Sequence, residues 1–195
     1  MLSWLRQNRR FLLALFLLFV ARASLADHYL VPSGSMEYTL LPGDRVFVDK
    51  RAYGLRVPLT QIKLLAGASP SPGEVVVFDA PDSGIRLIKR VVAVGGDVVQ
   101  VRDGHVLING KPFPRDASGD VERFSERSAN LNLTFGGGPD LPPTQVPEGH
   151  VFVLGDSRGN SRDSRWFGFV PEAALYAKAL GVYYRSGEGF VWVPL

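Results

Sequence analysis

The sequence predicts a mainly β protein, in which one N-terminal transmembrane helix precedes a curved antiparallel β-sheet domain with an inserted loop or hairpin region. Three observations predict this fold. Short runs of β-branched and aromatic residues, bounded by glycine, proline and aspartate, recur through most of the chain. One apolar run lies near the N-terminus. The apolar pattern is lost over residues 112–149, which marks the insertion.

Length and charge favour one main domain and a membrane flank. The chain has 195 residues, 46% of them hydrophobic, which is enough for one core. It has 22 basic and 19 acidic residues, and Arg6, Arg9 and Arg10 precede the apolar run. Without these three, 19 basic residues balance 19 acidic ones. The excess charge is therefore typical of a cytoplasmic membrane flank, and we expect no nucleic-acid partner.

The titratable residues exclude several classes of site. There is no cysteine, which excludes disulfides, thiolate metal sites and cysteine nucleophiles. His28, His105 and His150 are far apart and in no ligand spacing. We expect neither a metal nor a cofactor.

The apolar run, residues 11–21, would cover about 16 Å of a hydrocarbon layer about 30 Å thick. Extension to Ala26 gives about 24 Å, a short anchor from which Arg22 can reach the interface. This predicts a cytoplasmic N-terminus over 1–10, an anchor over 11–26 and an exported β domain over 27–195. The small residues that end the segment are also typical of a removable signal peptide. We expect a retained anchor, because it would hold the loop that follows it close to the membrane.

Six runs in the exported part predict strands, at residues 45–48, 74–78, 87–94, 97–102, 106–108 and 150–154. Asp103-Gly104 and Asn109-Gly110 predict hairpin turns on either side of the fifth run.

Two further segments differ from this pattern. Residues 112–149 are rich in charge, serine, glycine and proline, and predict an insertion or a long surface loop. Pro171, followed by alanines and leucines, predicts a short helix over 171–180.

A candidate nucleophile and base occur 54 residues apart. Ser35 lies in a turn marked by Pro32 and Gly34, between the apolar run and the first predicted strand. Serine needs a base, and a lysine is one documented solution. Strand alternation places Lys89 on an otherwise apolar face, where burial would lower its pKa, whereas Arg90 would stay charged. The alternative for residues 33–35 is that they are ordinary turn residues. The alternative for Lys89 is that its side chain extends to solvent from an edge strand.

Residues 155–165 form a dense run of short polar side chains after the last predicted strand. They fit either a solvated loop or a polar network that braces a buried amine. In the network, Ser161 would orient a neutral lysine and Asp163 would pair with Arg165.

The chain resembles bacterial type I signal peptidases in several blocks that occur in that family's order. These blocks are Pro-Ser-Gly-Ser-Met at 32–36, Thr-Leu at 39–40, Gly-Asp at 43–44, Val-Val-Phe at 76–78, Ile-Lys-Arg-Val at 88–91, Gly-Asp at 96–97, and residues 155–165 and 168–171. They cover most of the chain outside the insertion.

The resemblance implies Ser35 as nucleophile and Lys89 as general base. It implies an oxyanion hole formed by the Ser35 N–H and the Ser33 hydroxyl, with Ser161 hydrogen-bonded to the lysine. It also implies substrate pockets for alanine-like side chains at Tyr29, Val31, Leu40, Val76, Leu87 and Ile88, residues that would otherwise be core.

Some residues depart from the family's pattern or extend it. Tyr38 stands where the family usually has proline, and Gly159 where it usually has aspartate. In the resembled family, Trp166 and Phe167 would lie on an apolar surface that enters the bilayer; otherwise one is core and the other incidental.

The expected function is a membrane-bound serine endopeptidase that cleaves signal peptides from exported preproteins after an A-x-A site. The expected location is the bacterial inner membrane, as a single-pass protein with its catalytic domain outside, and the expected partners are signal peptides and lipid. Two alternatives stay open. One is a dedicated Ser/Lys processing peptidase of a conjugation or pilus system, and the other is a non-catalytic exported β module that binds peptides. The sequence leaves the oligomeric state open.

Overall fold

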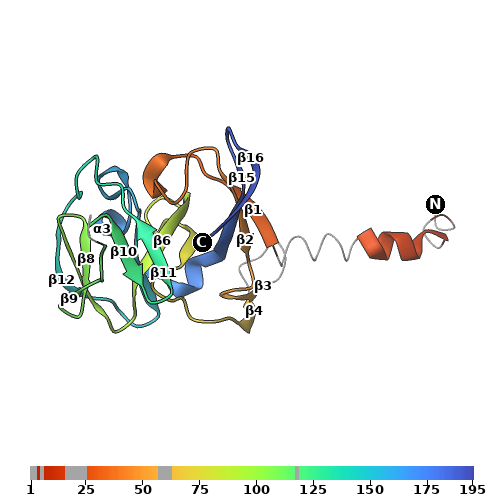
Figure 1. The fold of residues 1–195 in the computed structure, drawn as a ribbon. Helices are drawn as coiled ribbons and strands as arrows, with labels where there is room; N and C mark the ends of the chain where they lie inside the picture. The colour runs from red at the N-terminus through yellow and green to blue at the C-terminus, as the bar shows by residue number, and fades with distance from the viewer. Residues whose placement is uncertain (1–3, 5–6, 16–25, 57–62, 117–118) are drawn as a thin grey trace.

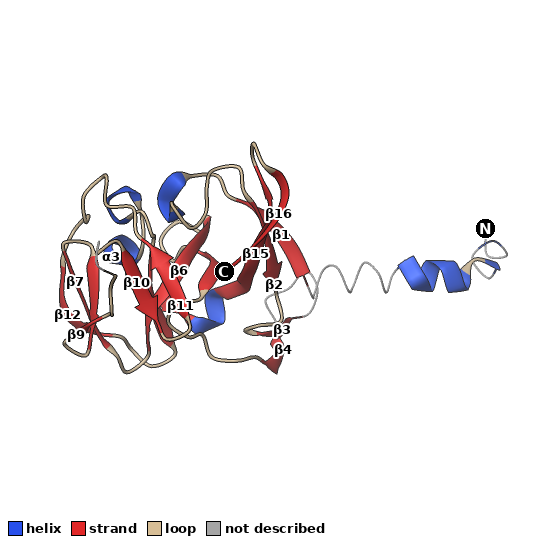
Figure 2. Ribbon diagram, in the orientation of Figure 1, coloured by secondary structure: helices blue, strands red, loops and turns tan. Residues whose placement is uncertain are grey.

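The structure is a computed structural model, which describes residues 4, 7–15, 26–56, 63–116 and 119–195. Strands dominate this part of the chain and its helices are short (Figure 2). The predicted mainly β class is therefore confirmed. Within the described ranges, no helix combines the length and the apolar character that a membrane crossing requires. Most of the predicted anchor, residues 16–25, lies outside these ranges.

The largest sheet of the described body has eight strands. Its strands are, in order, β1 (Ala26–Leu30), β2 (Arg45–Asp49), β15 (Leu175–Arg185), β5 (Val75–Asp79), β6 (Arg86–Val94), β13 (His150–Leu154) and β14 (Val170–Pro171), and β16 (Gly189–Pro194) pairs with β15. Every pairing in this sheet is antiparallel.

Smaller elements complete the described body. A four-stranded sheet has the order β12 (Leu141–Gln145), β7 (Val98–Arg102), β8 (His105–Ile108) and β9 (Lys111–Pro112). Two hairpins are formed by β10 (Val121–Phe124) with β11 (Arg127–Asn130), and by β3 (Gly54–Arg56) with β4 (Lys63–Ala66). The short helices are η1 (Gly34–Met36), η2 (Arg158–Asn160), α3 (Ser164–Phe167) and η3 (Glu172–Ala174). Figure 1 shows β8, β9 and β12 at the end of the body opposite β1, β2 and β16.

The two predicted hairpin turns are present. Asp103 and Gly104 have φ of 50° and 80°, and Asn109 and Gly110 have φ of 53° and 77°. Two successive positive φ values match a type I′ turn, whose twist suits paired antiparallel strands. These turns join β7 to β8 and β8 to β9.

The helix predicted over residues 171–180 is wrong. Pro171 ends β14, residues 172–174 form η3, and β15 begins at Leu175. Leu175, Ala177 and Ala179 are buried at every second position, which is strand spacing. Pairing with β2 and β5 on the two edges of β15 outweighs the helical preference of alanine and leucine.

The prediction of a long surface loop over residues 112–149 is also wrong, although the predicted hairpin is present as β10 and β11. The segment contains β10, β11 and β12. It buries Phe124, Leu131 and Val146 in the core and fully buries Glu122. The apolar residues of this segment stand singly among polar ones, so the sequence pattern did not predict that they pack in the core.

Strand β6 is buried on both faces. Residues 88–93 are all buried, because β6 lies between β5 and β13 and has core clusters on both sides. Strand alternation alone predicted one apolar face that carries Lys89. Arg90, on the other face, is buried as well.

Candidate active site

Ser35 is the middle residue of η1, in the loop that joins β1 to β2. The two ends of this loop are tied together, because the Val31 N–H donates to Asp44 O and the Gly43 N–H donates to Val31 O, each at 2.9 Å. Met36, next to Ser35, is fully buried in the core. The main chain of Ser35 is therefore held on a fixed scaffold, as positioned reactive groups require.

Lys89 lies in the middle of β6, opposite Val76 of β5. Its Nζ lies 2.6 Å from Ser35 Oγ, within hydrogen-bond distance. The residue is 3% exposed. The fold thus brings together the two side chains that the sequence proposed as nucleophile and base.

Burial makes Lys89 a usable base. Desolvation lowers the pKa of Lys89 from 10.5 to about 8, while the negative charges of Asp163 and Asp156 act in the opposite direction. With that pKa, about one lysine in ten is neutral at pH 7, against fewer than about one in a thousand at the ordinary value. A neutral Nζ at this distance can accept the proton of Ser35 Oγ.

The two predicted oxyanion donors lie in one short turn. Ser33 is exposed, and its Oγ lies 3.5 Å from Ser35 Oγ. The Ser35 N–H belongs to the first turn of η1, where helical N–H groups have no acceptor within the helix. This arrangement suits binding of a negative oxygen close to Ser35 Oγ.

The predicted pair of Asp163 and Arg165 is present in the polar loop after β13. Arg165 Nε and Nη2 each lie 2.8 Å from a different carboxylate oxygen of Asp163. The two side chains are 1% and 0% exposed. The same carboxylate accepts the Gly155 N–H at 3.1 Å, so the pair also fixes the start of the polar loop.

A second buried ion pair was missed at the sequence level. Arg90 Nε and Nη2 lie 2.9 Å and 2.7 Å from the two carboxylate oxygens of Asp156. Thr39 Oγ1 donates to the same carboxylate at 2.5 Å. Through Thr39, the pair joins β6 and the polar loop to the loop between β1 and β2 that carries Ser35. An arginine beside the candidate base could have indicated it, because a buried arginine requires a buried acid.

Gly155 packs directly against the loop that carries Ser35. A Cβ at Gly155 would overlap the Ser35 carbonyl oxygen and Ser161 Oγ, and would lie 2.6 Å from Ser161 Cβ. The Ser157 N–H donates to the same Ser35 carbonyl at 3.2 Å. The polar loop therefore forms a wall behind Ser35.

Ser161 lies beside the pair but does not make the expected hydrogen bond. Its Oγ is buried and has no hydrogen-bond partner among the described residues. Lys89 Nζ instead lies against Ser35 Oγ. An orienting role for Ser161 stays a prediction.

The structure does not gather the six predicted substrate-pocket residues into one group. Val31, Leu40 and Ile88 are buried in one core cluster, against which Tyr29 packs. Val76 is buried in a neighbouring cluster, against which Leu87 packs. Four of the six are at most 3% exposed, so in this structure they act as core side chains.

Trp166 and Phe167 take different environments. Trp166 is 64% exposed, whereas Phe167 packs edge-on against Phe78 with ring centroids 6.0 Å apart. Phe167 is therefore partly a core residue.

Both departures from the resembled family contact the 112–149 segment. Tyr38 is exposed and forms an isolated bridge with Leu131. Gly159 lies so close to Phe135 that a Cβ would overlap its carbonyl oxygen. An aspartate at 159 would not fit here without movement of this segment.

Within the part of the chain that the structure describes, no three or more His, Cys, Asp or Glu side chains are grouped so as to hold a metal ion.

Comparisons with known proteins agree on one family. The family model described as "Signal peptidase, peptidase S26" matches residues 2–184. The chain is 33% identical to signal peptidase I of Pseudomonas fluorescens, over 90% of this chain and 71% of that protein. It is 31% identical to the probable signal peptidase I-1 of a Synechocystis species, over 94% of this chain and 86% of that protein. A solved signal peptidase I of Enterococcus faecalis matches with 30% identity and a TM-score of 0.40, over 64% of this chain and 97% of that one.

Proposed function

Because the chain belongs to the signal peptidase family, peptidase S26, and is a serine peptidase that cleaves signal peptides, we propose that Ser35 is its nucleophile and Lys89 its general base. The 2.6 Å contact between Lys89 Nζ and Ser35 Oγ, in a buried setting that lowers the pKa of the lysine, carries this proposal.

Acylation begins when neutral Lys89 Nζ takes the proton of Ser35 Oγ. The oxygen then attacks the scissile carbonyl carbon to form a tetrahedral intermediate. The Lys89 ammonium next donates that proton to the leaving amine, the C–N bond breaks, and the signal peptide stays on Ser35 as an ester. Lys89 is neutral again at the end of acylation and can act as the base in deacylation.

Deacylation repeats the same proton transfers with water. Lys89 removes a proton from a water molecule, the resulting hydroxide attacks the ester carbon, and the lysine returns the proton to Ser35 Oγ as the ester bond breaks. In both halves the negative carbonyl oxygen is stabilised by the Ser35 N–H and the Ser33 hydroxyl. Such donors contribute about 10²- to 10³-fold each in other acyl-transfer enzymes.

We also propose the cellular setting that this activity requires. Residues 1–10 would lie in the cytoplasm, residues 11–26 would anchor the chain in the bacterial inner membrane, and residues 27–195 would act on its outer face. The apolar run and the three arginines before it support this placement. Membrane lipid and the signal peptides of preproteins would then be the partners.

The proposed substrate is a signal peptide with alanine at positions −1 and −3. We expect the enzyme in detergent to cleave an A-x-A peptide at one bond, directly after the −1 alanine, as mass spectrometry of the products will show. A matched peptide with leucine at −1 should be cleaved at least about tenfold more slowly, because leucine is much bulkier than the alanine of the proposed substrate. Equal cleavage of the two peptides would contradict the A-x-A assignment.

A further inference from the structure

A buried arginine in the polar loop connects the inserted segment with the wall behind Ser35. Arg158 is 1% exposed. Its Nη2 lies 2.7 Å from Glu122 Oε2, its Nε donates to the Gly155 carbonyl at 3.1 Å, and its Nη1 donates to the Gly104 carbonyl. The guanidinium therefore joins three separate segments through charge-assisted hydrogen bonds.

Glu122 supplies the negative charge that this arginine needs. It belongs to β10, in the 112–149 segment, and it is completely buried. Burial alone would raise its pKa, but the charge of Arg158 holds the pKa of Glu122 at about 2. His105 Nδ1 lies 3.6 Å from Glu122 Oε1, beyond hydrogen-bond distance. Glu122 Oε1 also accepts the Val106 N–H at 2.9 Å, which fixes the carboxylate against β8.

Gly155, which Arg158 contacts, lies directly against Ser35. Arg158 holds the Gly155 carbonyl, and the Cα of Gly155 packs against the carbonyl oxygen of Ser35 with no room for a Cβ. The Ser157 N–H, next to Arg158 in the loop, donates to that same oxygen. A shift of Arg158 would therefore move two contacts on the main chain of Ser35.

The inserted segment holds the polar loop at a second point. Arg165 Nη1 donates to the Gly137 carbonyl at 2.7 Å, and its Nη2 donates to the Arg158 carbonyl at 2.5 Å. The 112–149 segment therefore contacts the polar loop behind Ser35 through two arginines, Arg158 and Arg165.

Given Ser35 and Lys89 as the proposed catalytic pair, we propose that Glu122 and Arg158 are positioning residues, by which the 112–149 segment aligns Ser35 with Lys89 through Gly155. Neither side chain needs to touch substrate for this role. Loss of the pair should therefore lower kcat more than it raises KM.

The test compares purified full-length variants on an A-x-A peptide, at a temperature where thermal unfolding shows each to be folded. We expect Glu122→Gln to lower kcat about tenfold or more and to change KM by less than about twofold. The pH midpoint of kcat should not move, because burial of Lys89 is unchanged. Arg158→Met should give a similar or larger loss of kcat.

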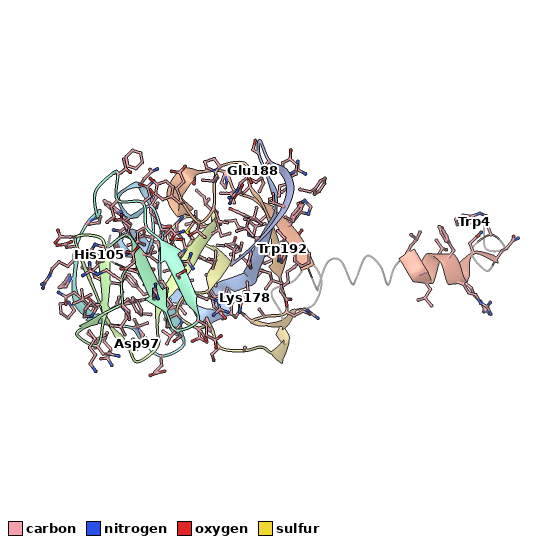
Figure 3. All side chains as sticks on the ribbon, in the orientation of Figure 1. Trp4, Asp97, His105, Lys178, Glu188 and Trp192 are labelled. Carbon is pink, nitrogen blue, oxygen red and sulfur yellow. The ribbon has the colours of Figure 1, made fainter. Side chains whose placement is uncertain are left out.

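A matched control separates positioning from general destabilisation. Glu74→Gln breaks a partly buried ion pair, in which Lys178 Nζ lies 2.5 Å from Glu74 Oε1. Figure 3 shows Lys178 and His105, which neighbours Glu122, in different parts of the body. Glu74→Gln should lower the unfolding temperature comparably but keep kcat within about twofold of wild type.

A double variant, Glu122→Gln with Arg158→Met, removes both charges and so avoids an unpaired buried ion. If the two residues act as one unit, its kcat will match that of Arg158→Met alone. A wild-type kcat in the double variant, losses that multiply, or a Glu122→Gln loss no larger than that of Glu74→Gln would overturn the positioning role. Activity retained in Lys89→Arg would instead refute the catalytic assignment, so the two failures are distinguishable.

Discussion

Lys89→Arg is expected to abolish signal peptide cleavage, with kcat/KM reduced by at least about 10⁴-fold. Arginine keeps the positive charge and most of the side-chain length, but it cannot give up its proton in a protein. The proposed mechanism requires a neutral nitrogen 2.6 Å from Ser35 Oγ to accept the serine proton. A guanidinium at that position would only donate hydrogen bonds to Ser35. Initial rates on an A-x-A peptide measure the effect.

Lys178→Arg provides the matched control for this substitution. Lys178 pairs with the buried carboxylate of Glu74, and neither residue belongs to the proposed machinery. Its activity should stay within about twofold of wild type. Retention of more than about 1% of wild-type activity by a folded Lys89→Arg enzyme would refute lysine as the base.

Gly155→Ala is expected to lower kcat by about 100-fold or more. The new methyl group would overlap the Ser35 carbonyl oxygen and Ser161 Oγ, and backbone atoms cannot move aside as a flexible side chain can. Displacement of Ser35 by about 1 Å is enough for a loss of this size, because proton transfer and attack depend steeply on geometry. Steady-state kinetics on the A-x-A peptide, with thermal unfolding in parallel, provides the measurement.

Gly187→Ala controls for the added methyl group itself. Gly187 has a φ of +90°, and its Cβ would meet no atom within 4 Å. Alanine there should cost about 1 to 2 kcal/mol of stability from backbone strain and leave kcat unchanged. If Gly155→Ala keeps kcat within about threefold of wild type, the wall behind Ser35 has no role in catalysis.

The sequence was most informative where chemistry depends on neighbours along the chain. The six predicted strands and the two Gly-containing turns are all present, because β-branched runs and positive-φ turn residues act locally. A serine in a turn and a lysine in an apolar strand each had an ordinary structural alternative, so Ser35 and Lys89 were predicted as a pair through the ordered sequence blocks that resemble signal peptidases. Their contact is a consequence of the fold.

Long-range pairing explains what the sequence could not show. Residues 175–180 satisfy helical propensity and strand alternation equally, and only pairing with β2 and β5 selects the strand. A glutamate such as Glu122 is predicted to lie on the surface, and its burial is explained only by its ion pair with Arg158, 36 residues later in the chain. Arg90 likewise needs Asp156 before its burial makes physical sense. No local pattern specifies such partners.

The pKa of Lys89 in the folded enzyme tests the central claim most directly. Nuclear magnetic resonance with ¹⁵N-labelled lysine would follow the titration of Lys89 Nζ beside the pH dependence of kcat/KM. Burial places this pKa at about 8, so the rate should rise with pH, as the ammonium loses its proton, and level off above the same midpoint. Agreement of the two midpoints near 8 is the predicted result. A Lys89 that titrates near 10.5, while the rate rises with a midpoint near 8, would contradict the account and assign the general base to another group.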